Sequence, residues 1–212
     1  MDGCTVYTLA IFDFDGTLAD TLPWFAEVFN GVADRYRFRR IAPGELEALR
    51  GVENRALMRH LGISGWKVPF IAAHMRKLAA RDAHRLRLFD GAAPLLRRLH
   101  DQGVTVAIVS SNTEANVRRV LGAETAGLVA HYACGASIFG KHTKFRAVLA
   151  RAGVPAGRAI AIGDEIRDIH AARRAGIACG AVTWGFALPD ALKAHRPDAV
   201  FERFEEIAER MG

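Results

Sequence analysis

The sequence predicts an α/β fold: a doubly wound, mostly parallel, Rossmann-like sheet with an inserted α-helical cap domain. Apolar, β-rich runs alternate with helical patterns along most of the chain, as expected for parallel strands joined by crossover helices. Residues 20–88 interrupt this alternation with helical periodicity and no convincing strand. We therefore expect an α/β core domain made of residues 1–19 and 89–212, and a helical cap domain made of residues 20–88.

Short apolar runs mark the expected strands of the core. The runs at 6–12, 104–109 and 158–162 are almost continuously hydrophobic, which is typical of strands that helices cover on both faces. Two further runs, 129–133 and 178–183, complete the predicted sheet.

Helical patterns fill the intervals between these runs, over residues 92–102, 114–121, 143–152 and 165–175. Several of them end in a glycine, in the stretches LHDQG, RRVLG, LARAG and ARRAG, and glycine is common just after a helix. Strands and helices thus alternate in the order that a doubly wound sheet requires.

Composition is that of an ordinary globular protein, with 50% hydrophobic and 25% charged residues among 212. No apolar run approaches the roughly 20 residues of a membrane span, and we expect neither a signal peptide nor membrane attachment. Three scattered cysteines favour reduced thiols in a cytoplasmic protein. The net charge of +6 is spread over helical segments, so we expect no nucleic-acid partner. The expected assembly is a monomer or a homodimer.

Polar residues follow three of the predicted strands. Asp13 follows the first, residues 110–112 (SSN) follow the second, and Asp164 and Asp168 follow the fourth. Ligands of open α/β sheets bind outside the carboxyl ends of the strands. We therefore expect these side chains to form one site.

Two aspartates one residue apart, Asp13 and Asp15, begin this site. Asp13 and Asp164 would form an oxygen cradle for Mg²⁺, with the backbone carbonyl of Asp15 as a further ligand. Asp13 could then act as nucleophile and Asp15 as general acid and base. Gly16 allows a sharp turn, and the Thr17 hydroxyl would orient Asp15.

Phosphoryl transfer needs neutral and positive groups around the phosphate oxygens. Ser110, with the turn amides before the helix at Thr113, offers neutral donors. Lys141 would supply the positive charge, and Lys144, one turn further, is an alternative that the sequence leaves open.

Substrate specificity should come from the cap. The aromatic and basic candidates for facing the strand ends are Trp24, Arg50, Arg55 and His60, and the alternative for each is a surface or packing position on a helix.

Two other readings of the sequence are weaker. The stretch 135–143 (GASIFGKHT) nearly fits a nucleotide-binding P-loop, but His142 occupies the position of its Mg²⁺-binding hydroxyl. A zinc site from His131, Cys134 and His142 lacks paired ligand spacing.

Four segments together resemble the motifs of the haloacid dehalogenase-like (HAD) superfamily in order and spacing. They are DFDGT at 13–17, the apolar run ending in Ser110, Lys141, and GDEIRD at 163–168. The helical insertion after the first motif is similar to the cap of the phosphoglycolate phosphatase-like branch. The resemblance covers essentially the whole chain.

This resemblance implies a Mg²⁺-dependent phosphatase of a small phosphorylated metabolite, with 2-phosphoglycolate as the family's default ester. It implies an aspartyl-phosphate on Asp13, acid and base catalysis by Asp15, and phosphate binding by Ser110 and Lys141. Candidate metal ligands are Asp13, Asp15, Asp164 and Asp168, the last in an outer shell. Candidate substrate-binding residues are Gly16, Thr17, Ser111, Asn112, Trp24 and Arg55.

Three positions refine what the resemblance implies. The dehalogenases of the family lack an aspartate at position 15, so its presence here favours phosphate ester chemistry. His142 stands where proline is common, and Glu165 replaces a small polar residue and would touch the outer shell of the metal. A sugar phosphomutase of the same branch and a non-catalytic regulatory protein of the same fold remain alternatives.

Overall fold

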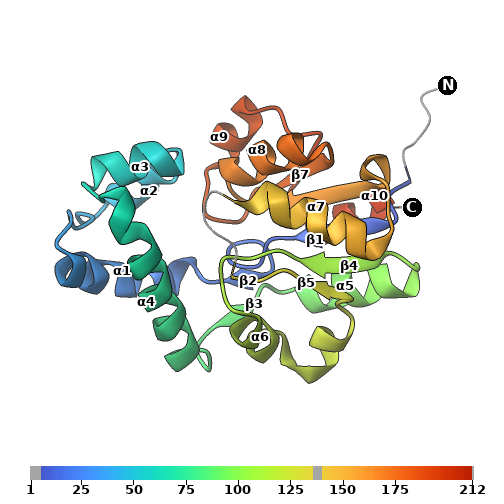
Figure 1. Ribbon diagram of the computed structural model, residues 1–212, viewed down its shortest axis with the longest axis horizontal. Helices are drawn as coiled ribbons and strands as arrows, with labels where there is room; N and C mark the ends of the chain where they lie inside the picture. Colours follow the sequence, from blue (N-terminus) through green and yellow to red (C-terminus); the bar gives the residue numbers. More distant parts are fainter. Residues whose placement is uncertain (1–5, 136–139, 212) are drawn as a thin grey trace.

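The computed structural model describes residues 6–135 and 140–211. At its centre is a six-stranded sheet in the order β5-β4-β1-β6-β7-β8, in which every neighbouring pair is parallel (Figure 1). Its strands are β1 (Leu9–Phe12), β4 (Thr105–Ile108), β5 (His131–Tyr132), β6 (Ala159–Gly163), β7 (Ala178–Val182) and β8 (Ala199–Phe201). The predicted α/β class with a doubly wound parallel sheet is confirmed.

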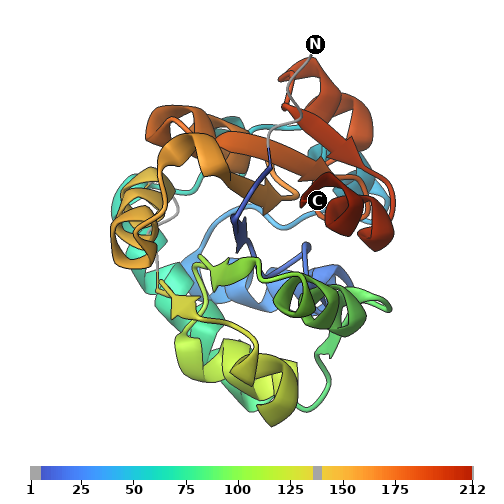
Figure 2. The ribbon, with the colours of Figure 1, turned by 90° about the vertical axis from the view of Figure 1, so that its right-hand side faces the viewer.

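Helices cover both faces of the sheet, as Figure 2 shows with the green and orange helices on opposite sides. One face carries α5 (Ala92–Asp101), α6 (Glu114–Gly127) and α10 (Phe204–Met211). The other carries α7 (Lys141–Ala152), α8 (Ile166–Ala175) and α9 (Pro189–Ala194). Side chains of strand β1 alternate between the two faces of the sheet. Ala10 and Phe12 pack against the helices of the first face, and Leu9 and Ile11 pack against those of the second.

Four α-helices stand to one side of the sheet (Figure 1). They are α1 (Leu22–Tyr36), α2 (Glu45–Leu49), α3 (Asn54–His60) and α4 (Val68–Arg81), with a 3₁₀ turn η1 (Gly65–Lys67) before α4. We call residues 22–81 the helical segment. The chain enters and leaves it through an antiparallel pair of short strands, β2 (Ala19–Asp20) and β3 (Arg87–Leu88).

Several elements differ from the expected ranges. The first apolar run, 6–12, forms a strand only from Leu9 onwards, and helix α7 begins at Lys141 rather than near Thr143. Elements β2, β3, β8, α9 and α10 were not predicted, and a second 3₁₀ turn, η2 (Ala156–Arg158), precedes β6. Helices α7 and α8 end at Gly153 and Gly176, as predicted.

Within the described part of the chain, no helix is both long and apolar enough to cross a membrane. Cys134 and Cys179 are free thiols, and Cys4 lies outside the described residues. Residues 136–139 of the P-loop-like stretch also lie outside them.

The register of the central strands places the polar residues at one edge. Phe12, the last residue of β1, pairs with Ile108 of β4 and Ile162 of β6. The segments that follow these three residues therefore leave the sheet side by side. Asp13 is held there by its amide, which donates to the Ile162 carbonyl at 2.8 Å.

Candidate active site

A buried ion-pair network lies at this edge. The side chains of Asp13, Lys141 and Asp168 are 3%, 6% and 2% exposed, respectively. Lys141 Nζ lies 2.7 Å from Asp13 Oδ2 and 2.6 Å from Asp168 Oδ1. The other carboxylate oxygen of Asp13 accepts a 2.7 Å hydrogen bond from the Phe14 amide. Buried charges of opposite sign at this distance hold one another in a fixed geometry.

Asp168 is held by the start of helix α8. Its Oδ2 accepts a 3.1 Å hydrogen bond from the Glu165 amide, in a reciprocal capping arrangement of the first helical turn. Both of its oxygens therefore have protein partners, which fits a residue that positions Lys141.

Asp164 follows β6 and is fully buried. Its Oδ1 accepts a 2.7 Å hydrogen bond from the Thr17 hydroxyl, and its Oδ2 accepts one of 2.7 Å from the Phe186 amide. The expectation that Thr17 orients Asp15 was therefore wrong: the hydroxyl donates to Asp164 instead. The two residues lie 147 positions apart, and only the folded chain brings them together.

Asp15 is half-buried at the same edge, and its Oδ2 accepts a 3.4 Å hydrogen bond from the Asn112 amide group. Ser110 is fully buried, and its Oγ accepts a 3.0 Å hydrogen bond from the backbone amide of Asn112. The hydroxyl proton of Ser110 therefore remains available for donation. Asn112 in turn accepts from the Thr113 amide at 2.9 Å. The loop after β4 thus presents a fixed set of donors beside Asp15.

Burial shifts the ionisation of these groups. Burial, followed by the Asp13 charge, raises the pKa of Asp15 to about 6. Burial also raises the pKa of Asp164 well above its ordinary value, and it raises the pKa of Asp13 although Lys141 opposes the effect. Burial alone would lower the pKa of Lys141, but the Asp13 and Asp168 carboxylates outweigh it and raise that pKa.

One cation of the site, Arg167, was not predicted from the sequence. Arg167, near the start of α8, lies 4.0 Å from Asp13 Oδ2 and forms an ion pair with Glu165. Its position inside GDEIRD, between Asp164 and Asp168, was the available signal. Glu165 also accepts a 3.0 Å hydrogen bond from Asn54 of the helical segment, so its carboxylate is already engaged by protein partners.

The carboxylates at this edge fit a hard divalent cation. Oxygen atoms of Asp13, Asp164 and Asp168 lie within 4.8 Å of one another, and all three residues are buried. Oxygen donors without nitrogen or sulfur suit Mg²⁺. Asp13 Oδ2 contacts Lys141 Nζ at 2.7 Å, and a carboxylate oxygen with one such partner keeps a lone pair for a cation. Asp15 is not part of this group of three.

The structure distinguishes the two candidate lysines by place. Lys141 is buried in the ion-pair network, whereas Lys144 is half-buried one turn further along α7. Among described residues, His131, Cys134 and His142 do not form a convergent group of metal ligands.

A cavity of about 320 Å³ opens beside this edge. Its polar end is formed by Asp15, Ser111, Asn112, Glu165 and Arg167. Most of the remaining lining consists of apolar side chains of the helical segment, among them Phe25, Phe29, Leu49, Leu57, Met58 and Ile71. The cavity therefore joins the carboxylate edge to an apolar chamber.

The four expected cap residues fall in different places. Trp24 lines the cavity, and its ring nitrogen donates to Asp82 at 3.0 Å. Arg50 also lines it, with its guanidinium donating to the Phe186 carbonyl at 2.9 Å. Arg55 and His60 are exposed, and the cavity lining does not include them.

Comparisons with known proteins agree with this geometry. The chain is 32% identical over 195 residues to a phosphoglycolate phosphatase of Synechococcus elongatus, covering 91% of each chain. It is 28% identical over 214 residues to the tyrosine-protein kinase PtkA of Mycobacterium tuberculosis, covering 96% of this chain and 72% of the kinase. A solved haloacid dehalogenase-like family hydrolase from Streptococcus pneumoniae superposes with a TM-score of 0.78 at 20% identity, covering 97% of this chain and 99% of that one. A family model described as haloacid dehalogenase-like hydrolase matches residues 10–182, and the chain belongs to this family.

Proposed function

We propose that this hydrolase is a Mg²⁺-dependent phosphatase that cleaves small organic phosphate monoesters through an aspartyl-phosphate on Asp13. The observation that carries the proposal is the convergence of Asp13, Asp164, Asp168 and Lys141 next to Asp15 and Ser110 at one sheet edge. The site contains a carboxylate nucleophile, an acid, and donors for phosphate oxygens, which phosphoryl transfer requires. Phosphatases among its relatives support the same reaction.

The first step is attack of an Asp13 carboxylate oxygen on phosphorus. The bond between phosphorus and the ester oxygen breaks, and Asp15 gives its proton to the departing alkoxide. The pKa of Asp15, raised to about 6, keeps part of this carboxyl protonated close to neutral pH. Lys141 and the Ser110 hydroxyl would stabilise the phosphate oxygens.

The second step regenerates the enzyme. Asp15, now a carboxylate, accepts a proton from water while the water oxygen attacks the phosphorus of the aspartyl-phosphate. The bond between Asp13 and phosphorus breaks, and inorganic phosphate leaves. Asp13 and Asp164 would hold Mg²⁺, which when bound neutralises charge on the phosphate oxygens.

We further propose that the helical segment acts as a cap in a cytoplasmic enzyme and that it selects the organic group of the ester. The relatives make 2-phosphoglycolate the first ester to test. The chamber nevertheless offers mainly apolar side chains, whereas 2-phosphoglycolate carries a carboxylate and little apolar surface. The lining favours an ester with an apolar organic group.

Phosphate release from a panel of esters tests both the Mg²⁺-dependent reaction and the preference for an apolar organic group. We expect release that requires Mg²⁺ and stops with EDTA, with kcat/KM for 1-naphthyl phosphate about tenfold or more above that for 2-phosphoglycolate. Trp24→Ala, which removes a wall of the cavity, should reduce this preference. Trp66→Ala is the matched control, because Trp66 is 69% exposed and lies outside the lining.

Other outcomes of the panel would contradict the account at separate points. Preference for 2-phosphoglycolate would overturn the apolar specificity and leave the reaction intact. A bisphosphate requirement with an isomeric product would indicate a phosphomutase. Absence of turnover with every ester, despite Mg²⁺ binding, would favour a regulatory protein.

A further inference from the structure

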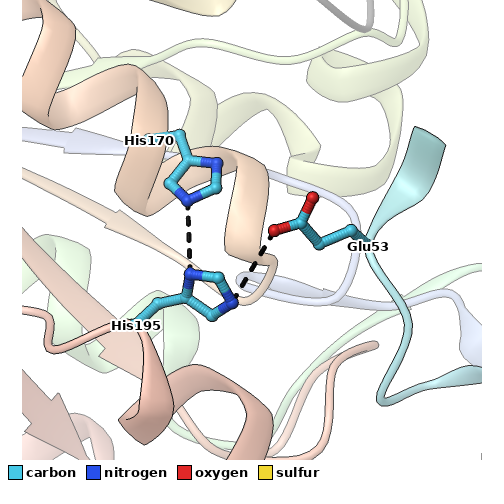
Figure 3. Close-up of side chains that lie close together, drawn as sticks. All are labelled: Glu53, His170 and His195. Atoms are coloured by element: carbon cyan, nitrogen blue, oxygen red, sulfur yellow. Dashed lines mark hydrogen bonds and ion pairs between the residues drawn. The ribbon is translucent and has the colours of Figure 1, made fainter. Parts of the chain in front are cut away.

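A second group of metal-ligand side chains lies outside the carboxylate edge. It consists of Glu53 at the start of α3, His170 in α8, and His195 at the end of α9 (Figure 3). The three residues come from distant parts of the sequence and from both the helical segment and the core. One ligand atom from each lies within 4.8 Å of the others.

The two imidazole rings approach each other through one nitrogen of each ring. His170 Nε2 lies 3.2 Å from His195 Nδ1, and the ring planes meet at 71° (Figure 3). Two nitrogens bound to one tetrahedral Zn²⁺ at 2.0–2.1 Å are separated by about 3.3 Å, so the observed spacing matches that of zinc ligands. Glu53 Oε1 lies 3.8 Å from Nε2, the other ring nitrogen of His195, and its side chain is 49% exposed, so in the proposed site this carboxylate turns toward the ion held by the two imidazoles.

We propose that Glu53, His170 and His195 form a second metal site, which binds a transition-metal ion such as Zn²⁺ and ties the start of α3 to the core. Two imidazoles and one carboxylate form a donor set that Zn²⁺ prefers and Mg²⁺ does not. Water completes the coordination. The side chains of His195 and Glu53 are 28% and 49% exposed, so an ion reaches the group from solvent.

The site sits where it can influence the cavity. Asn54, the residue after Glu53, donates to Glu165 at 3.0 Å, and both of these residues line the cavity. Helix α8 carries His170 and also begins next to Glu165. A metal ion between Glu53 and His170 therefore fixes the position of Asn54 and its hydrogen bond to Glu165 in the cavity wall.

The test is calorimetric titration of Zn²⁺ into the full chain in excess Mg²⁺, which occupies the oxygen-only carboxylate edge. We expect one Zn²⁺ per chain, with affinity reduced at least tenfold in His170→Gln and in His195→Gln. His100→Gln, an exposed histidine of α5, is the matched control and should bind as the wild type does. Asp13→Asn should also retain Zn²⁺ binding, which separates this site from the proposed phosphatase site.

Two further measurements keep the result independent of variant folding. In the wild-type chain, Cu²⁺ bound under the same conditions should show electron paramagnetic resonance couplings from two imidazole nitrogens. Zn²⁺ should slow amide hydrogen exchange in α3 of the wild type and leave Glu53→Gln, changed only at an exposed carboxylate, much less protected. Absence of Zn²⁺ binding, or equal affinity in both histidine variants and wild type, would overturn the proposal and indicate a plain hydrogen bond between the rings.

Discussion

Asp13→Asn is expected to lower kcat by about 10⁴-fold or more, because an amide oxygen is a poor nucleophile and nothing else in the network replaces it. The substitution should not unfold the protein. Lys141 keeps its 2.6 Å contact with Asp168. Folding raises the pKa of Asp13, so the ionised carboxylate lowers the free energy of unfolding once the pH exceeds the pKa that Asp13 has in the unfolded chain. A neutral amide at this position removes that destabilisation.

The measurement is single-turnover phosphate release together with thermal unfolding of both proteins in EDTA. The asparagine variant should unfold no earlier than the wild type at pH 7. Asp34→Asn, an exposed aspartate of α1 paired with Arg40, is the matched control and should keep full turnover. Turnover of Asp13→Asn near the wild-type rate would remove Asp13 as the nucleophile.

Gly16→Ala is expected to reduce both stability and activity. Gly16 has a φ of +78°, where a side chain is strained, and an added Cβ would lie 2.2 Å from Asp164 Oδ2 and 2.4 Å from a ring carbon of Phe186. Asp164 or the Phe186 loop must move to admit the methyl group. We expect the free energy of unfolding to fall by about 2–4 kcal/mol.

Urea unfolding in EDTA measures this loss without a contribution from metal binding. Gly31→Ala provides the control, because Gly31 lies inside α1 and an added Cβ would meet nothing within 4 Å beyond the adjoining helix backbone and chain neighbours. Alanine there should raise stability by up to about 1 kcal/mol. Equal stability of Gly16→Ala and wild type would mean that the turn after Asp15 is not as tightly packed as described.

The central sheet was predictable because its strands are short apolar runs with helices between them. Strands β1, β4, β5 and β7 lie inside the predicted ranges, and β6 extends one residue beyond its range, to Gly163. Strand β8 was missed because it has only three residues and sits at the edge, where burial imposes little pattern. Strands β2 and β3 have two residues each, too few for any periodicity.

The site was predictable only where strand ends determine it. Asp13, Ser110 and Asp164 follow neighbouring parallel strands, so topology alone brings them together. Side-chain contacts between residues far apart in the sequence depend on how the folded chain packs, which no local pattern encodes. For this reason Arg167 was missed, the partner of Thr17 was wrong, and Arg55 was expected near a cavity that it does not line.

The stereochemical course at phosphorus tests the aspartyl-phosphate most directly. The substrate is a phosphorothioate ester made chiral at phosphorus with oxygen isotopes, hydrolysed in water of a third isotope. Attack by Asp13 and then by water inverts the phosphorus twice, so the account predicts retention of configuration. Inversion would mean a single direct attack by water and would contradict Asp13 as the nucleophile.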